Sequence, residues 1–130
     1  MNDATQKNLD RLAAECAQKV INCRPEGSEI KDMENTVTKA LGVLQENGVY
    51  ACFLYLLAKE DEKGKVVVDK MLDLLNQLNF GWGKPSGISA EKVLDYINNK
   101  VVVNLECLLL AKETLEQMLI YARYGAKACK

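Results

Sequence analysis

Basic side chains recur at helical spacing near the end of the chain. Arg123, Lys127 and Lys130 lie four and three residues apart, with Tyr121 and Tyr124 beside them. Lysines and arginines next to aromatic rings can bind phosphates and stack on bases. Cations at the end of a helix also oppose its dipole, which alone would explain the stripe. We predict these three basic residues as candidate phosphate contacts to a nucleic acid.

A second basic set lies near the start of the chain. Asp3, Lys7, Arg11, Glu15 and Lys19 follow one another at intervals of four residues. On a helix they share one face, where charges of alternating sign neutralise each other. Lys7 and Arg11 are therefore further candidate phosphate contacts, with neutralisation by the neighbouring acids as the competing interpretation.

Acidic residues occur at a spacing that some all-α nucleotide hydrolases use to hold magnesium. Glu26, Glu29 and Asp32 are three residues apart, as are Glu113 and Glu116. Such pairs place hard oxygen ligands on one helix face. Acids in the first turn of a helix also complement its dipole, and pairs of this kind are commonly solvated surface charges. We favour the surface interpretation and expect no metal or other cofactor.

Other catalytic chemistry is poorly supported. The chain contains no histidine, which removes Ser-His-Asp and Cys-His nucleophiles and imidazole acid–base catalysis. Residues 80–87 contain Gly-Lys, but a phosphate-binding loop requires Ser or Thr after the lysine, and Pro85 stands there. We expect an interhelical loop with Trp82 packed inward, and a protein that is not an enzyme.

Cysteine usage favours the cytoplasm. The five cysteines are odd in number and form no C-x-x-C pair, and residues 1–11 are polar, without the apolar core of a signal peptide. The longest apolar run, Val49–Ala58, is too short to span a bilayer. We expect a soluble cytoplasmic protein.

Composition is that of an ordinary globular domain. The 130 residues include 17 basic and 18 acidic side chains, a formal net charge of −1 and 48% hydrophobic residues. That length suits one domain with its own core, so we assign residues 1–130 to a single domain.

Apolar residues recur every three or four positions, which predicts an all-α bundle of about six helices with a long C-terminal helix. Asp3 and Ser28 are the expected caps of the first two helices. Asn47-Gly48 should end the second, and a buried or interfacial third should run from Val49 to about Lys59.

Residues 61–65 then form an expected charged loop before the fourth helix. Ser89 should cap a fifth helix, and the sixth should run from about Val101 to Lys127. The valine triplets at 66–68 and 101–103 favour strands in isolation, but each leads into leucine-rich helical periodicity, and we assign both to helix starts.

Three stretches resemble the small all-helical subunit of the Cmr complex, the type III-B CRISPR RNA-guided effector. Together they span nearly the whole chain. They are the set Leu9-Asp10, Ala14, Ala17 and Val20; the segment 44–59, in which Asn-Gly precedes an apolar helix ending in lysine; and the set Glu113, Leu115, Met118, Tyr121 and Arg123.

The resemblance implies a non-catalytic role in antiviral defence. In that family, copies of the small subunit stack into a minor filament beside backbone subunits that resemble RNA-recognition motifs. The implied partners are these backbone subunits, further copies of the chain, and guide and target RNA. The isolated chain should be mainly monomeric. A helical adaptor that binds only protein would show the same periodicities, and the magnesium hydrolase stays the less favoured alternative.

Overall fold

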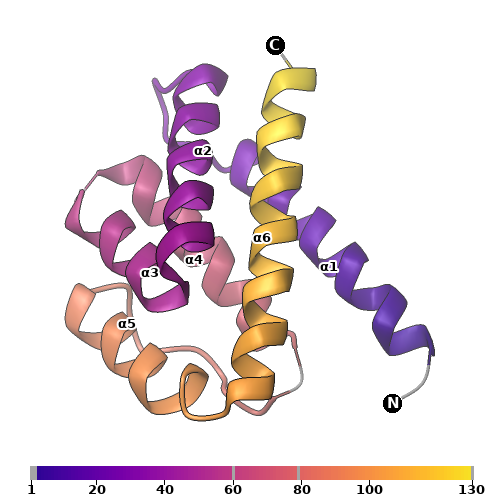
Figure 1. The fold of residues 1–130 in the computed structure, drawn as a ribbon. Coiled ribbons are helices and arrows are strands. Elements are labelled where there is room, and N and C mark those ends of the chain that lie inside the picture. Colours follow the sequence, from indigo (N-terminus) through magenta and orange to yellow (C-terminus); the bar gives the residue numbers. More distant parts are fainter. Residues whose placement is uncertain (1–2, 60, 79, 130) are drawn as a thin grey trace.

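The computed structural model describes residues 3–59, 61–78 and 80–129, and their side chains from Leu9 onward. Six α-helices and one π-helical turn occur in these ranges, and no strand does (Figure 1). The predicted all-α fold with a long C-terminal helix is therefore confirmed. In chain order the elements are α1 (Asp3–Asn22), α2 (Ile30–Asn47), α3 (Val49–Ala58), α4 (Glu62–Asn76), α5 (Ala90–Tyr96), the π-turn η1 (Ile97–Val101) and α6 (Leu105–Ala128).

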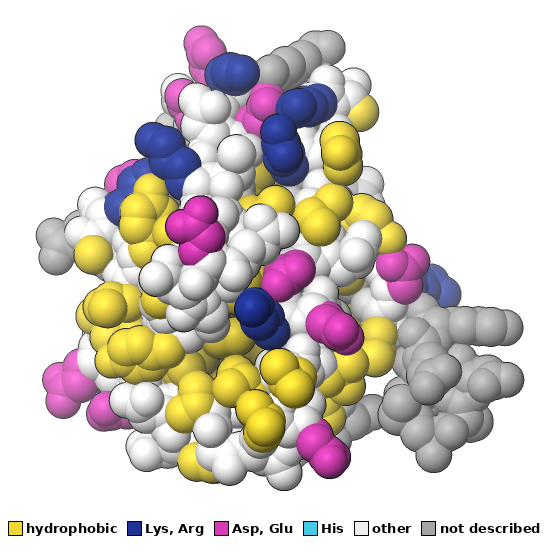
Figure 2. All heavy atoms as spheres, in the orientation of Figure 1, with side chains coloured by type: hydrophobic (Ala, Val, Ile, Leu, Met, Phe, Trp, Pro, Cys, Tyr) yellow, Lys and Arg dark blue, Asp and Glu magenta, His cyan; other side chains and the backbone are white. Residues whose placement is uncertain are grey.

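Helix α6 is the central element of the packing. It runs antiparallel to α2 and also packs against α1, while α3 packs against α2 and α4, and α5 packs against α3 (Figure 1). On the surface seen in Figure 2, lysine and arginine side chains gather over the upper part, where α2 begins and α6 ends. Hydrophobic side chains gather over the lower part, where α3, α5 and the start of α6 lie.

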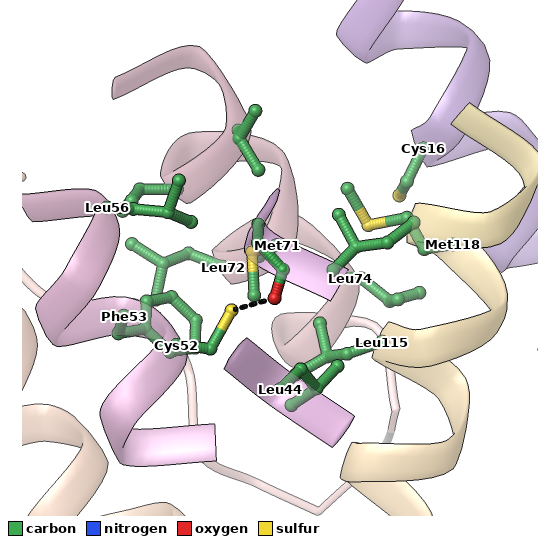
Figure 3. Close-up of a cluster of buried hydrophobic side chains, with 14 of the residues drawn as sticks. Cys16, Leu44, Cys52, Phe53, Leu56, Met71, Leu72, Leu74, Leu115 and Met118 are labelled. Atoms are coloured by element: carbon green, nitrogen blue, oxygen red, sulfur yellow. Dashed lines mark hydrogen bonds between the residues drawn. The ribbon is translucent and has the colours of Figure 1, made fainter. Parts of the chain in front are cut away.

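All six α-helices contribute buried side chains to the core, and its centre lies between α2, α3, α4 and α6. Leu44, Phe53, Leu72 and Leu115 point toward one another there (Figure 3), and none is more than 1% exposed. Cys52 lies among them, where its thiol donates to the carbonyl of Ala40 at 3.4 Å and burial raises its pKa to about 12. Cys52 therefore behaves as a small apolar residue.

The connection between α2 and α3 follows the predicted Asn47-Gly48 stop. Gly48 has a φ of +95°, and its N–H donates to the carbonyl of Leu44 at 3.0 Å, which closes the last turn of α2. An L side chain rarely adopts that backbone conformation, so glycine is suited to the position. The chain thereby reverses within one residue and places α3 against α2.

Two predicted details near helix starts are wrong. The Ser28 hydroxyl donates to the carbonyl of Pro25 at 2.6 Å, and Glu29 is the residue that caps α2. The Glu29 N–H donates to the Asp32 carboxylate at 3.1 Å, so the two acids form a reciprocal capping box. The predicted charged loop at 61–65 is also absent, because the Asp61 carboxylate accepts the N–H of Gly64 at 2.7 Å and starts α4 there.

The predicted start of the sixth helix at Val101 is also wrong. Val101 ends the π-turn η1, in which the N–H of Val102 donates to the carbonyl of Ile97 at 3.1 Å. Helix α6 begins only after Asn104, whose side-chain oxygen accepts the N–H of Cys107 at 3.0 Å. Asparagine is a strong cap and valine is a weak one, which explains the shift. The other valine triplet, 66–68, lies inside α4 as helix.

Candidate nucleic-acid interface

The C-terminal end of α6 carries one fully exposed cation and one half-buried one. Lys127 is exposed on the last turn, and residues 117–129 contain no acid. Arg123 is half buried, and its Nε atom is buried without a hydrogen-bond partner among the described residues. Lys130 lies outside the described residues. Of the predicted trio, Lys127 is therefore the side chain that the structure places in solvent.

The two tyrosines of this end differ in availability. Tyr124 is 61% exposed, and its ring can stack on a base. The Tyr121 hydroxyl donates to the Asp10 carboxylate of α1 at 2.5 Å, and this hydrogen bond raises the pKa of Tyr121. Tyr121 therefore ties α6 to α1, while Tyr124 faces solvent beside Lys127.

The basic residues of α1 have a different environment. The Arg11 Nε lies 2.9 Å from the Glu15 carboxylate on the exposed face of the helix. This ion pair is the neutralisation that the four-residue spacing predicted. Lys7 belongs to α1, and its side chain lies outside the described residues. In the described part of α1, Glu15 partly neutralises Arg11, so Arg11 attracts a phosphate less strongly than an unpaired arginine would.

The structure does not bring the five candidate magnesium ligands together. Glu29 and Asp32 cap α2. Glu113 lines a groove of about 240 Å³ between α1 and α6, together with Asp10 but without Glu29, Asp32 or Glu116. Within the described ranges, no three cysteine or carboxylate side chains are placed to hold a metal ion. The acids of α2 are explained by capping.

The glycine-rich segment at 80–87 is the predicted interhelical loop. Phe80 and Trp82 pack ring against ring with centroids 4.7 Å apart, and Trp82 is packed against the core. The Lys84 ammonium pairs with Asp73 and Asp69 of α4, and its hydrogen bond to Asp73 raises the pKa of Lys84. This lysine binds the loop to α4 and is not presented to a phosphate.

The Tyr96 hydroxyl holds the same loop from the other side. It donates to the carbonyl of Gly83 at 2.9 Å, and burial raises the pKa of Tyr96 to about 12. The phenol therefore stays protonated as a donor at neutral pH.

The structure shows a large exposed hydrophobic surface, of which the sequence predicted only the α3 part, as a buried or interfacial helix. We call it the apolar face. It consists of Tyr50 and Leu54 on α3, Val102 and Val103 after η1, and Leu105 and Leu109 on α6. The sequence carries one signal for its α6 part, because five of the first six residues of α6 are leucine or cysteine, which is more than the single apolar stripe that packing against a core requires.

Known proteins provide no family assignment. Scans of protein-family models, curated proteins and solved structures each found no match to this chain. Among the described helices, none combines the length and hydrophobicity needed to cross a membrane.

Proposed function

We propose that this chain is a non-catalytic small subunit of a type III-B CRISPR (Cmr) effector complex, and that the C-terminal end of α6 contacts RNA phosphates. The observation that carries the proposal is the exposed Lys127 beside the exposed Tyr124, on a helix end without acids. The local potential at this end is positive although the chain as a whole has a net charge of −1.

Such contacts would be independent of RNA sequence, because base pairing between guide and target supplies the specificity. One or two cations per copy bind weakly. Copies repeated along a filament add their contacts, so the assembly can hold RNA that a monomer does not. The partners in this proposal are the backbone subunit that resembles an RNA-recognition motif, further copies of the chain, and guide and target RNA in the cytoplasm.

A helical adaptor that binds protein without RNA is the second candidate. Two observations favour it: Arg11 is paired with Glu15, and the Nε of Arg123 is buried. Both reduce the positive charge that is free to meet a phosphate. The two candidates make opposite predictions about salt.

The test is RNA retention by the complex reconstituted with the other subunits, measured between about 50 and 200 mM salt. Changing Arg123, Lys127 and Lys130 to glutamine should lower the log–log salt slope by about one to two per copy of the chain, since each lost phosphate contact removes about one. A control that changes Lys63, Lys92 and Lys100 to glutamine removes the same charge elsewhere and should lower it by less than about one. An unchanged slope in the first variant would contradict RNA contact and leave the adaptor as the function.

A further inference from the structure

The most exposed side chains of the apolar face lie just after η1 and at the start of α6. Val103, Leu105 and Leu109 are 70%, 67% and 53% exposed, and Leu54 on α3 is 45% exposed. Single exposed leucines are common, but contiguous apolar surface marks a contact site. Figure 2 shows these side-chain types gathered over α3, α5 and the start of α6.

The backbone beneath the apolar face is held rigidly. Val101 and Ile97 are fully buried, and the Asn104 cap fixes the chain that enters α6. On α3, Phe53 and Leu56 are buried next to the exposed Leu54. A partner would therefore meet a preformed surface, and little conformational entropy would be lost on docking.

Two exposed acids flank the part of the apolar face that lies on α6. Glu106 and Glu113 are exposed on α6, close in sequence to Leu105 and Leu109, whereas Lys112 between them is half buried. Helix α3 has no charged residue, and Lys100 on η1 is the exposed lysine nearest in sequence to the valines. A two-fold contact between copies would bring two such acidic margins together, which costs free energy.

We propose that the apolar face docks a different protein subunit, whose contact surface has an apolar centre and a basic margin. The apolar side chains supply the affinity, and Glu106 and Glu113 select the partner by charge. This inference rests on the proposed function, because it assumes an assembly with other subunits. It adds a second surface at the opposite end of α6 from the RNA contacts.

The test uses the backbone subunit loaded with guide RNA and measures its affinity for the full chain. Changing both Leu105 and Leu109 to lysine should weaken binding about 100-fold, since it removes apolar contact and adds like charge to the margin. Changing the same two residues to glutamate should weaken it about tenfold, because the new acids meet basic groups. The matched control changes Ala14 and Gln18, an exposed pair on α1 with the same spacing, to lysine and should leave the affinity unchanged.

Both leucines are exposed, so thermal unfolding should show that each variant is folded. If the lysine and glutamate variants lose the same affinity for the backbone subunit, the partner's contact surface has no basic margin. If neither variant loses affinity, the apolar face is not a docking surface. A micromolar dimer of the unaltered chain that the lysine changes abolish would show that a second copy is the occupant. If the unaltered chain fails to bind the guide-loaded subunit, the proposed function falls too; if it binds regardless of the leucine changes, only this inference falls.

Discussion

The two ends of α6 present opposite chemistry on the same helix. Its N-terminal end exposes Leu105 and Leu109 beside acids, and its C-terminal end exposes Tyr124 and Lys127 without any. Between them, Leu115 and its neighbours are buried in the core. At 1.5 Å per residue, the 24 residues of α6 are about 36 Å long. A packed helix of this length can hold a protein contact and an RNA contact at a fixed separation.

The largest expected effect comes from breaking the middle of α6. Leu115 is fully buried against Leu44, so Leu115→Ala leaves a cavity and should lower the free energy of unfolding by about 3 kcal/mol. Urea denaturation measures this. Leu109→Ala, at a position that is 53% exposed, should cost less than about 0.5 kcal/mol. Similar costs at the two positions would mean that Leu109 is a core residue and not part of a contact surface.

A smaller effect should separate the two ends. Asn104 caps the N-terminal end of α6, and Asn104→Ala should lower the free energy of unfolding by about 1 kcal/mol. Amide hydrogen exchange should increase in the first turn of α6 and not at its C-terminal end, because only the first turn loses its acceptor. Asn98→Ala, on the exposed side of η1, is the control. Faster exchange along the whole helix would contradict the independence of the two ends.

The smallest expected change in the free energy of unfolding concerns the loop at residues 80–87, which precedes α5. Lys84 is 37% exposed, so after solvent screening Lys84→Met should cost only about 0.5 kcal/mol near neutral pH. Pairing with Asp73 raises the pKa of Lys84 above 10.5. The stabilisation is therefore fully present below the unfolded pKa and is lost as the pH rises through the folded one.

Comparing the variant with the unaltered chain at about pH 8 and about pH 11.5 checks this sign. The difference in unfolding free energy should shrink at the higher pH. A difference that grew with pH would show that the charged form of Lys84 does not stabilise the fold.

Sequence periodicity was sufficient to predict the helices, because apolar residues recur every three or four positions along them and form the face that packs against the core. Its errors lie where local hydrogen bonds decide the boundary: Glu29 caps α2 in place of Ser28, and Asn104 starts α6 in place of Val101. A cap depends on which side chain reaches a free N–H, and several nearby polar residues satisfy the same pattern. Residues 61–65 were misassigned because charge alone does not end a helix.

The candidate sites were less predictable than the fold. Spacing placed Arg123 and Lys127 on one stripe, but it could not show that Arg123 would be half buried. The α6 part of the apolar face was missed because hydrophobic residues are assigned to the core by default, whereas the unbroken apolar run of α3 already predicted a buried or interfacial helix. Only packing shows that Leu105 and Leu109 exceed what the core can cover.

The π-turn η1 has a consequence for insertions and deletions. A π-turn contains one residue more than the α-helical turn it replaces, and Asn98 and Asn99 lie in it, both exposed. The extra residue is taken up within the turn, so deleting either one would restore ordinary α-helical pairing with little net rotation of the chain that follows. Val102 and Val103 would then keep their direction. Deleting one residue inside the regular helix α6 would instead rotate everything after it by about 100° and turn its buried face away from the core.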